Sequence, residues 1–204
     1  GGLFDLDSKK ERINEIDSLM IDSSFWNDSD TANKLISEFK NIKGIVENVD
    51  IITKSINDNI DIIGITNDKE ILLLAEEELN LLKTNVDKLE LETYLSGEYD
   101  NSNAVIEIHA GAGGTESCDW ASMLYRMYTR WCEKNNKKIE LLDYQDGEEA
   151  GIKSASIRVK GTNAYGYLKN EKGVHRLVRL SPFDSNNRRH TSFASVEVTP
   201  EIEQ

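Results

Sequence analysis

Residues 104–134 read AVIEIHAGAGGTESCDWASMLYRMYTRWCEK, and this stretch decides the fold of the second half of the chain. Ala104–His109 alternates apolar and polar residues, which predicts a strand. A glycine-rich turn follows, and Thr115–Lys134 is predicted to be a helix. Its apolar residues recur at i, i+3, i+4, i+7 and i+11 and form an amphipathic stripe, made of Trp120, Met123, Leu124, Met127 and Trp131.

Further strands are predicted downstream of this helix. They are Lys138–Tyr144, Ser154–Lys160, Tyr165–Leu180 with an interruption near Lys172-Gly173, and Thr191–Val198. In Ser154–Lys160, Ala155, Ile157 and Val159 face one way, while the polar residues between them form a basic outer face. The second half, residues 98–204, is therefore predicted to be an α+β domain with a sheet and one long helix.

The first half, residues 1–97, is predicted to be helical throughout. Helices are expected over Ser8–Met20, from Ser29 or Asp30 onwards, and from near Asn67 to near Gly97, with turn residues at 22–28. Asn67 and Glu70 have capping-box spacing for the third helix. Long helices with short breaks predict an antiparallel bundle.

Charge is distributed unevenly between the halves. The whole chain has a net charge of −13, and all of it lies in residues 1–100, which hold 23 acidic and 10 basic side chains. Residues 151–191 hold nine basic and two acidic side chains. The local excess of +7 is compatible with RNA phosphates, whereas the acidic half favours protein partners.

The sequence contains no motif that predicts catalysis or metal binding. The two cysteines, Cys118 and Cys132, make no disulfide framework and favour a cytoplasmic location. No apolar run approaches the roughly 18 residues typical of a membrane span. The histidines His109, His175 and His190 have no zinc-site spacing, so neither a metal nor another cofactor is expected.

Two loops are candidates for ligand binding. The first, His109–Glu116, is a glycine turn at a helix start, where free N–H groups suit phosphate or base acceptors. It lacks the Lys of a P-loop and the spacing of a dinucleotide fingerprint, so the pattern alone favours a tight connection without a ligand. The second, Ser181–Thr191, presents hydroxyls, an aromatic ring, two guanidiniums and an imidazole, which suit single-stranded bases. It is also compatible with a solvated hairpin tip.

Several motifs resemble those of bacterial class I peptide chain release factors, of the type that reads UAA and UGA. The resemblance is near-continuous over residues 104–198 and looser over 3–97, where it rests on Phe4–Asp7 and Phe25-Trp26. The matching segments are Ile108–Glu116, Asp119–Ala121, Asp143–Gln145, Gly147–Ala155, Gly173–Arg179, Ser181–Phe183 and Arg189–Val196. The Ser181-Pro182-Phe183 tripeptide matches the motif of this type, whereas the sister type carries Pro-x-Thr there.

The resemblance implies a role in codon recognition for eight residues. Gly113 and Glu116 would meet the first base through backbone groups, and Ser181 would hydrogen-bond either purine at the second position. His190 would stack on a base, and Thr191, with Val178 nearby, would contact the third base. The codon-reading set is Gly113, Glu116, Val178, Ser181, Pro182, Phe183, His190 and Thr191, and the expected contacts to the RNA backbone are Lys172, Arg179, Arg188 and Arg189.

The resemblance also implies partners and a missing activity. The family hydrolyses peptidyl-tRNA through a Gly-Gly-Gln motif in a following domain; no such triplet occurs here, so this chain is expected to be a truncated fragment without catalysis. The expected partners are the ribosomal decoding centre, the mRNA stop codon, the large-subunit stalk base and a GTPase recycling factor, with no membrane and a monomer on the ribosome. The alternatives are a ribosome-docking rescue or decoy factor, a nucleotide-binding enzyme using Gly111–Gly114, and a helical adaptor.

Overall fold

The computed structural model describes residues 5–95 and 97–202. The chain divides into two compact units, which we call the helical unit (Gly1–Tyr94) and the sheet unit (Leu95–Gln204). The sequence places the boundary three residues later, between residues 97 and 98. Phe4, one of the residues on which the looser N-terminal resemblance rests, lies outside the described residues.

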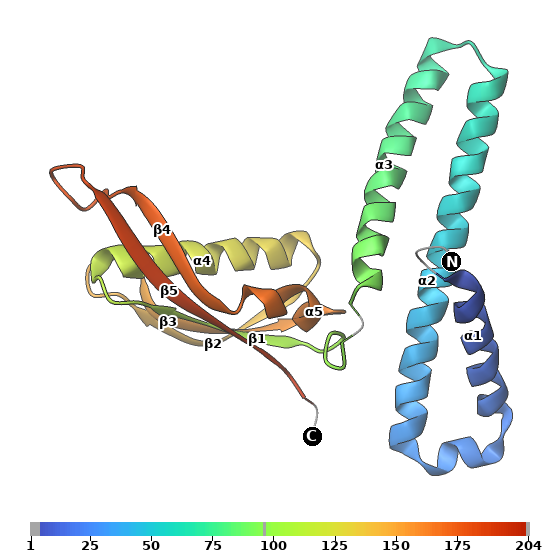
Figure 1. The fold of residues 1–204 in the computed structure, drawn as a ribbon, viewed down its shortest axis with the longest axis horizontal. Helices are drawn as coiled ribbons and strands as arrows, with labels where there is room; N and C mark the ends of the chain where they lie inside the picture. Colours follow the sequence, from blue (N-terminus) through green and yellow to red (C-terminus); the bar gives the residue numbers. More distant parts are fainter. Residues whose placement is uncertain (1–4, 96, 203–204) are drawn as a thin grey trace. The chain divides into compact units, whose positions relative to one another are not determined.

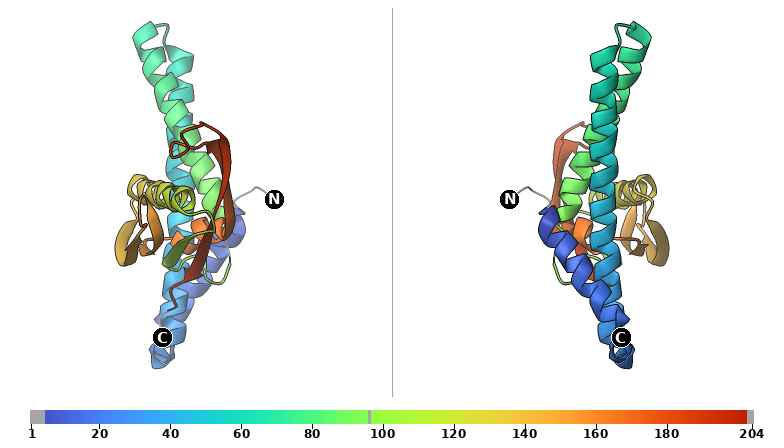
Figure 2. Two further views of the ribbon diagram at one scale, coloured as in Figure 1. Left: turned by 90° about the vertical axis from the view of Figure 1, so that its left-hand side faces the viewer. Right: turned by 90° about the vertical axis from the view of Figure 1, so that its right-hand side faces the viewer.

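The helical unit consists of antiparallel helices, as the sequence predicts. Its elements are α1 (Leu6–Ile21), the 3-10 helix η1 (Ser23–Asn27), α2 (Ser29–Ile65) and α3 (Lys69–Thr93). The 37-residue α2 is the long element, and α1 and α3 pack along different parts of it (Figures 1 and 2). Between α1 and α2, Ile16 is fully buried and Arg12 donates from Nε to Glu38 Oε1 at 2.7 Å.

Aspartates begin the helices of this unit. Asp28 accepts hydrogen bonds from the N–H groups of Asp30 and Thr31 and so caps α2. Asp68 accepts from the N–H of Glu70 and caps α3. The capping-box spacing predicts Asn67 as the cap, but the cap is Asp68, one residue later. The segment 22–28 holds a 3-10 helix, for which Asp22 supplies the cap.

The sheet unit contains a five-stranded antiparallel sheet in the order β2-β3-β1-β5-β4. The strands are β1 (Ala104–Ala110), β2 (Lys138–Asp146), β3 (Ile152–Lys160), β4 (Gly173–Leu180) and β5 (Arg189–Pro200). Together with the helices they give the predicted α+β class. In the central strand β1, Ile106 lies opposite Ile157 of β3 and Val198 of β5, and all three are buried.

The long helix α4 (Thr115–Lys134) covers one face of this sheet and begins and ends where the sequence predicts (Figure 1). Its buried face differs from the predicted stripe, of which only Leu124 is fully buried. Trp120 and Trp131 are partly buried against the core, whereas Met123 and Met127 are exposed. The apolar or small residues buried on α4 are Ser117, Ala121, Leu124, Tyr128 and Cys132.

One predicted strand is wrong in its first half. Residues 165–171, expected to be extended, belong to the short helix α5 (Ala164–Leu168) and the 3-10 helix η2 (Lys169–Glu171). The chain enters α5 through Asn163, whose φ of 59° turns the backbone, and Ala164 and Leu168 then bury in the core. The strand begins only at Gly173, where φ is 139°.

Asp100 anchors the start of the sheet unit. Its side chain is 2 % exposed, and it accepts hydrogen bonds from Lys169 Nζ at 2.8 Å and from the Gly97 N–H at 2.8 Å. Its carbonyl accepts from the Gly166 N–H at 3.0 Å. Burial raises the pKa of the Asp100 carboxyl, but the bonds from Lys169 and Gly97 outweigh burial and hold the pKa below its usual value.

Asp100→Ala is expected to lower the free energy of unfolding by about 3 kcal/mol, because it removes the hydrogen bonds that a buried carboxylate accepts from Lys169 and Gly97, each worth about 1.5–3 kcal/mol. The pKa of Asp100 is depressed, so its contribution is present above the unfolded pKa of about 3.9 and is lost as the pH falls through the folded value. Urea unfolding at pH 7 and pH 3 measures both effects. Glu98→Ala, at an exposed acid two residues away, is the control, and equal losses in the two variants would contradict the assignment.

Candidate nucleic-acid interface

The glycine turn between β1 and α4 is shaped by close backbone packing. The Gly111 N–H donates to the Phe193 carbonyl at 2.8 Å, and a Cβ at Gly111 would lie 2.5 Å from that oxygen. Gly113 and Gly114 have φ values of 135° and 61°. Gly114 is the N-cap of α4 and no side chain caps it, so the first-turn N–H groups are available to a ligand.

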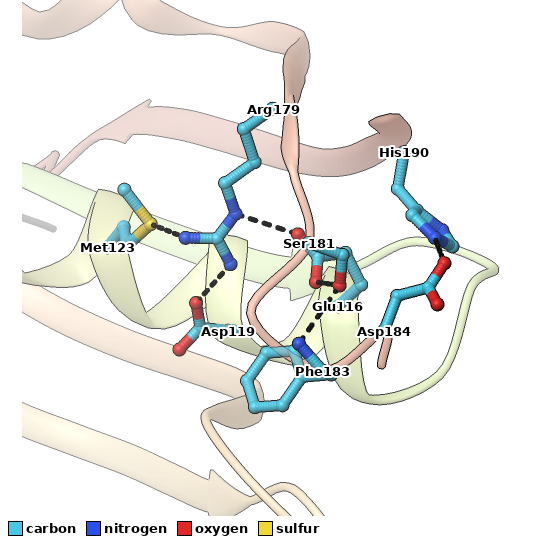
Figure 3. Close-up of polar contacts among 8 residues, drawn as sticks. All are labelled: Glu116, Asp119, Met123, Arg179, Ser181, Phe183, Asp184 and His190. Carbon is cyan, nitrogen blue, oxygen red and sulfur yellow. Dashed lines mark hydrogen bonds and ion pairs between the residues drawn. The ribbon is translucent and has the colours of Figure 1, made fainter. Parts of the chain in front are cut away.

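Glu116 joins the first turn of α4 to β4 and to the loop that follows it (Figure 3). Its Oε1 accepts a hydrogen bond from Arg179 Nε at 2.7 Å, and its Oε2 accepts one from the Ser181 hydroxyl at 2.7 Å. Arg179 also donates from Nη2 to Asp119 Oδ2 at 2.5 Å. The two candidate loops of the sequence are therefore held together by one buried carboxylate.

Electrostatics keep this network ionised. Burial raises the pKa of Glu116, but the hydrogen bonds from Arg179 and Ser181 act more strongly in the opposite direction and hold the pKa below its usual value. The hydrogen bond to Glu116 correspondingly raises the pKa of Arg179. The pair stays charged at neutral pH, where hydrogen bonds between charged groups are strongest.

Ser181 is buried, unlike a residue at a solvated hairpin tip. It is 4 % exposed, its O–H donates to Glu116, and its oxygen accepts from the Phe183 N–H at 3.2 Å. A hydroxyl has one proton and two lone pairs, so one lone pair remains for a ligand donor. Phe183, two residues on, is 48 % exposed and offers its ring.

Asp184 organises the loop between β4 and β5. Its carboxylate accepts hydrogen bonds from the Asn186 N–H at 2.8 Å, from Arg188 Nε at 2.9 Å and pairs with His190 Nε2 at 2.8 Å. The bonds from His190, the Asn186 N–H and Arg188 hold the pKa of Asp184 well below its usual range. The His190 imidazole is thus fixed against the loop while part of it stays exposed (Figure 3).

The strand register brings the remaining predicted residues together. Val178 lies directly opposite Thr191 across β4 and β5, and both are exposed. His190 pairs in the register with Arg179, so the loop, the helix start and the strand pair form one region. The predicted codon-reading residues therefore converge from three separate segments: the α4 start, the end of β4 and the start of β5.

The four basic residues expected at an RNA backbone differ in their surroundings. Arg179 is engaged by Glu116 and Asp119, so in this conformation its guanidinium positions the site and does not point into solvent. Lys172 pairs with Glu197 at 3.1 Å, and Arg188 with Asp184. Arg189 is exposed and has no ion-pair partner among residues 5–95 and 97–202.

Sequence reasoning missed Asp119 and Asp184 as parts of the site. Asp119 lies three residues after Glu116 on α4, a spacing that places both on one helix face and is a usable signal. Asp184 looked like ordinary turn chemistry. Among the described residues, no group of three or more metal-ligating side chains occurs, and no helix is long and apolar enough to cross a membrane.

Comparison with known proteins identifies the family to which the chain belongs. The family model of the PCRF domain matches residues 9–196, which is most of the chain. The chain belongs to the peptide chain release factor family. It is 52 % identical over 200 residues to peptide chain release factor 2 of Wolinella succinogenes, an alignment that covers 97 % of this chain and 54 % of that protein.

Other similar proteins are also release factors. Peptide chain release factor 2 of Listeria innocua is 48 % identical over 205 residues, covering 99 % of this chain and 56 % of the relative. The solved structure of RF2 of Thermus thermophilus matches with a TM-score of 0.66 and 42 % identity, covering all of this chain and 57 % of that one. The chain spans about half the length of the curated relatives it matches.

Proposed function

We propose that this chain recognises the stop codons UAA and UGA in the ribosomal decoding site, as the codon-reading part of a translation termination factor. The observation that carries the proposal is the junction of the Ser181-Pro182-Phe183 loop with the start of α4 through Glu116. It brings a tripeptide typical of release factors reading these codons next to uncapped helix N–H groups. The family membership supports the same reading.

The contacts suggest how two purines are accepted at the second position. With its proton held by Glu116, Ser181 keeps a lone pair that can accept from the amino group of adenine. For guanine, the hydroxyl proton has to turn from Glu116 to the O6 acceptor. Uridine at the first position is assigned to the N–H groups at Gly113–Glu116, and the third base to Thr191 beside Val178.

The proposal includes partners that the whole protein would meet. The sheet unit binds the decoding site of the small subunit. The acidic helical unit binds the stalk base of the large subunit and a GTPase recycling factor. Peptidyl-tRNA hydrolysis is assigned to a Gly-Gly-Gln motif outside these 204 residues, since no such triplet occurs within them. The proposed location is the cytoplasm.

Binding to ribosomes programmed with UGA, UAA, UAG or a sense codon tests the proposal. We expect preference for UGA and UAA. His190→Ala is expected to weaken binding to these two codons by about 1–3 kcal/mol, the contribution of one base stack. Ser181→Ala is expected to remove about 0.5–1.5 kcal/mol and to reduce the advantage over UAG.

Ser185→Ala is the matched control, because Ser185 is an exposed hydroxyl in the same loop with no role in the network. It should leave both affinity and codon preference unchanged. Equal binding of the unaltered chain to all four codons would refute the proposal.

A further inference from the structure

One face of α4 points away from the sheet and carries an apolar and basic surface. Met123 and Met127 are 41 % and 47 % exposed and lie one turn apart on this face. A shallow hollow of about 380 Å³ lies between them and is lined by four residues. We call this surface the α4 outer face, and it consists of Met123, Arg126, Met127 and Arg130.

The two arginines of the α4 outer face are exposed and have no acidic partner in the part of the chain that the structure describes. Elsewhere in the sheet unit, Arg158, Arg179 and Arg188 each pair with a carboxylate. Like charges at i and i+4 on a helix destabilise it, so the pair favours an external anion with more than one charge.

The side chains of the α4 outer face indicate the kind of anion. Guanidinium groups bind phosphates through paired N–H donors, and the thioethers between them supply an adaptable apolar floor for a sugar or a base. The arginine contacts proposed here are to phosphate oxygens and not to base edges. Contacts of this type fix position along a nucleic acid and carry no sequence information.

The α4 outer face is continuous with the candidate codon-reading site. Arg179, which holds Glu116 and Asp119, also donates from Nη1 to the Met123 sulfur at 3.6 Å (Figure 3). The hollow therefore begins where the Glu116 network ends. Met123 links the two surfaces, since it contacts Arg179 and also lines the hollow with Arg126 and Arg130.

We propose that the α4 outer face binds the phosphate backbone of ribosomal RNA beside the decoding site, with Arg126 and Arg130 as the phosphate ligands. The inference rests on the proposed function for the source of the RNA, because a stop-codon reader works on the ribosome. The α4 outer face increases the affinity for every programmed ribosome and does not affect which codon is preferred.

The test is a salt titration of binding to ribosomes programmed with UGA or with a sense codon. For Arg126→Gln/Arg130→Gln, affinity should fall at least about tenfold on both ribosomes at low salt. The slope of log K against log[salt] should decrease by about 1.4–1.8, since each phosphate contact contributes about 0.7–0.9. The ratio of affinities for UGA and the sense codon should not change.

Two further variants control for charge and for folding. Lys138→Gln/Lys160→Gln removes the same charge from exposed positions on β2 and β3, outside the α4 outer face and the codon-reading residues, and should leave the slope unchanged. Arg126→Lys/Arg130→Lys keeps both charges and should keep most of the slope. An unchanged slope in the Arg→Gln variant overturns the inference, as does an equal loss in the Lys138/Lys160 control.

A photoreactive amino acid at Met127 identifies the occupant. Crosslinks to ribosomal RNA are expected, whereas crosslinks confined to mRNA or to ribosomal proteins would overturn the inference. The two proposals fail separately. If the unaltered chain shows no preference for UGA, the codon-reading proposal is refuted. If Arg126→Gln/Arg130→Gln leaves the salt slope unchanged, the RNA-binding role of α4 is refuted.

Discussion

Gly151→Ala is expected to lower the free energy of unfolding of the sheet unit by more than about 4 kcal/mol, a range reached only by severe local clashes. Gly151 has a φ of 66°, which costs an alanine about 1–2 kcal/mol. The larger effect is steric. A methyl group there would overlap the carbonyl of Cys118 and lie 2.5 Å from the backbone nitrogen of Asp119, both in the first turns of α4.

Gly114→Ala is the matched control for this substitution. Gly114 has nearly the same φ, 61°, but a Cβ there meets nothing within 4 Å. With its ψ of −135°, Gly114 lies in a backbone region that alanine rarely adopts, so Gly114→Ala should cost only the conformational penalty of about 1–3 kcal/mol. Urea unfolding followed by the fluorescence of Trp120 and Trp131, both on α4, measures the difference. Equal midpoints for the two variants would show that the packing of Gly151 on α4 is not as tight as described.

Glu116→Ala is expected to cost about 3 kcal/mol of stability and to abolish codon preference. It removes two hydrogen bonds between a buried carboxylate and its partners, each worth about 1.5–3 kcal/mol when a charge is involved. Arg179 keeps Asp119 as a partner, which limits the loss. The Ser181 loop loses its attachment to α4, so binding to UGA ribosomes should fall together with stability.

The pH dependence of this effect has a defined sign. The pKa of Glu116 is depressed in the folded chain, so the stabilisation is present above the unfolded pKa of about 4.3 and is lost as the pH falls through the folded value. The difference between the unaltered chain and Glu116→Gln should therefore narrow in that range. Glu133→Ala, at an exposed acid on the same helix, should change stability by less than about 0.5 kcal/mol. A pH-independent difference would argue against the charged pair.

Long periodic segments were the most predictable part of the fold. The bounds of α4 follow from a hydrophobic pattern that persists over 20 residues and ends in polar residues. The side of α4 that is buried was predictable only in part. Leu124 is buried, and Trp120 and Trp131 pack partly buried against the core, whereas Met123 and Met127 are exposed.

Short segments were less predictable. Tyr165 and Tyr167 favour a strand by propensity, yet tertiary packing of Ala164 and Leu168 and the turn at Asn163 place them in a helix. The strand predicted over Thr191–Val198 is longer than its alternation suggests, because pairing extends it by two residues at each end, to Arg189 and Pro200. In both places the deciding contacts come from distant parts of the chain.

The sequence motifs select the residues of the candidate site, but they do not give the contacts between them. The motifs indicated that Ser181 and Glu116 serve one function, but they lie 65 residues apart. That the hydroxyl of Ser181 is buried and donates to Glu116 depends on the antiparallel register of β4 and β5 and on where α4 begins. No local pattern carries that information.

The central position of β1 has a consequence for synthesis. This strand is made before any of the other four, yet its two neighbours are β3 and β5, and Ala104 pairs with Val159 on one side and with Pro200 on the other. Both of its edges stay open until those later residues have emerged from the ribosomal tunnel. Pairings between residues so distant in sequence form slowly, and unpaired strand edges attract other chains. During translation the sheet unit therefore depends on its last strand, and the interval before β5 emerges is when the nascent chain is most exposed to misassembly.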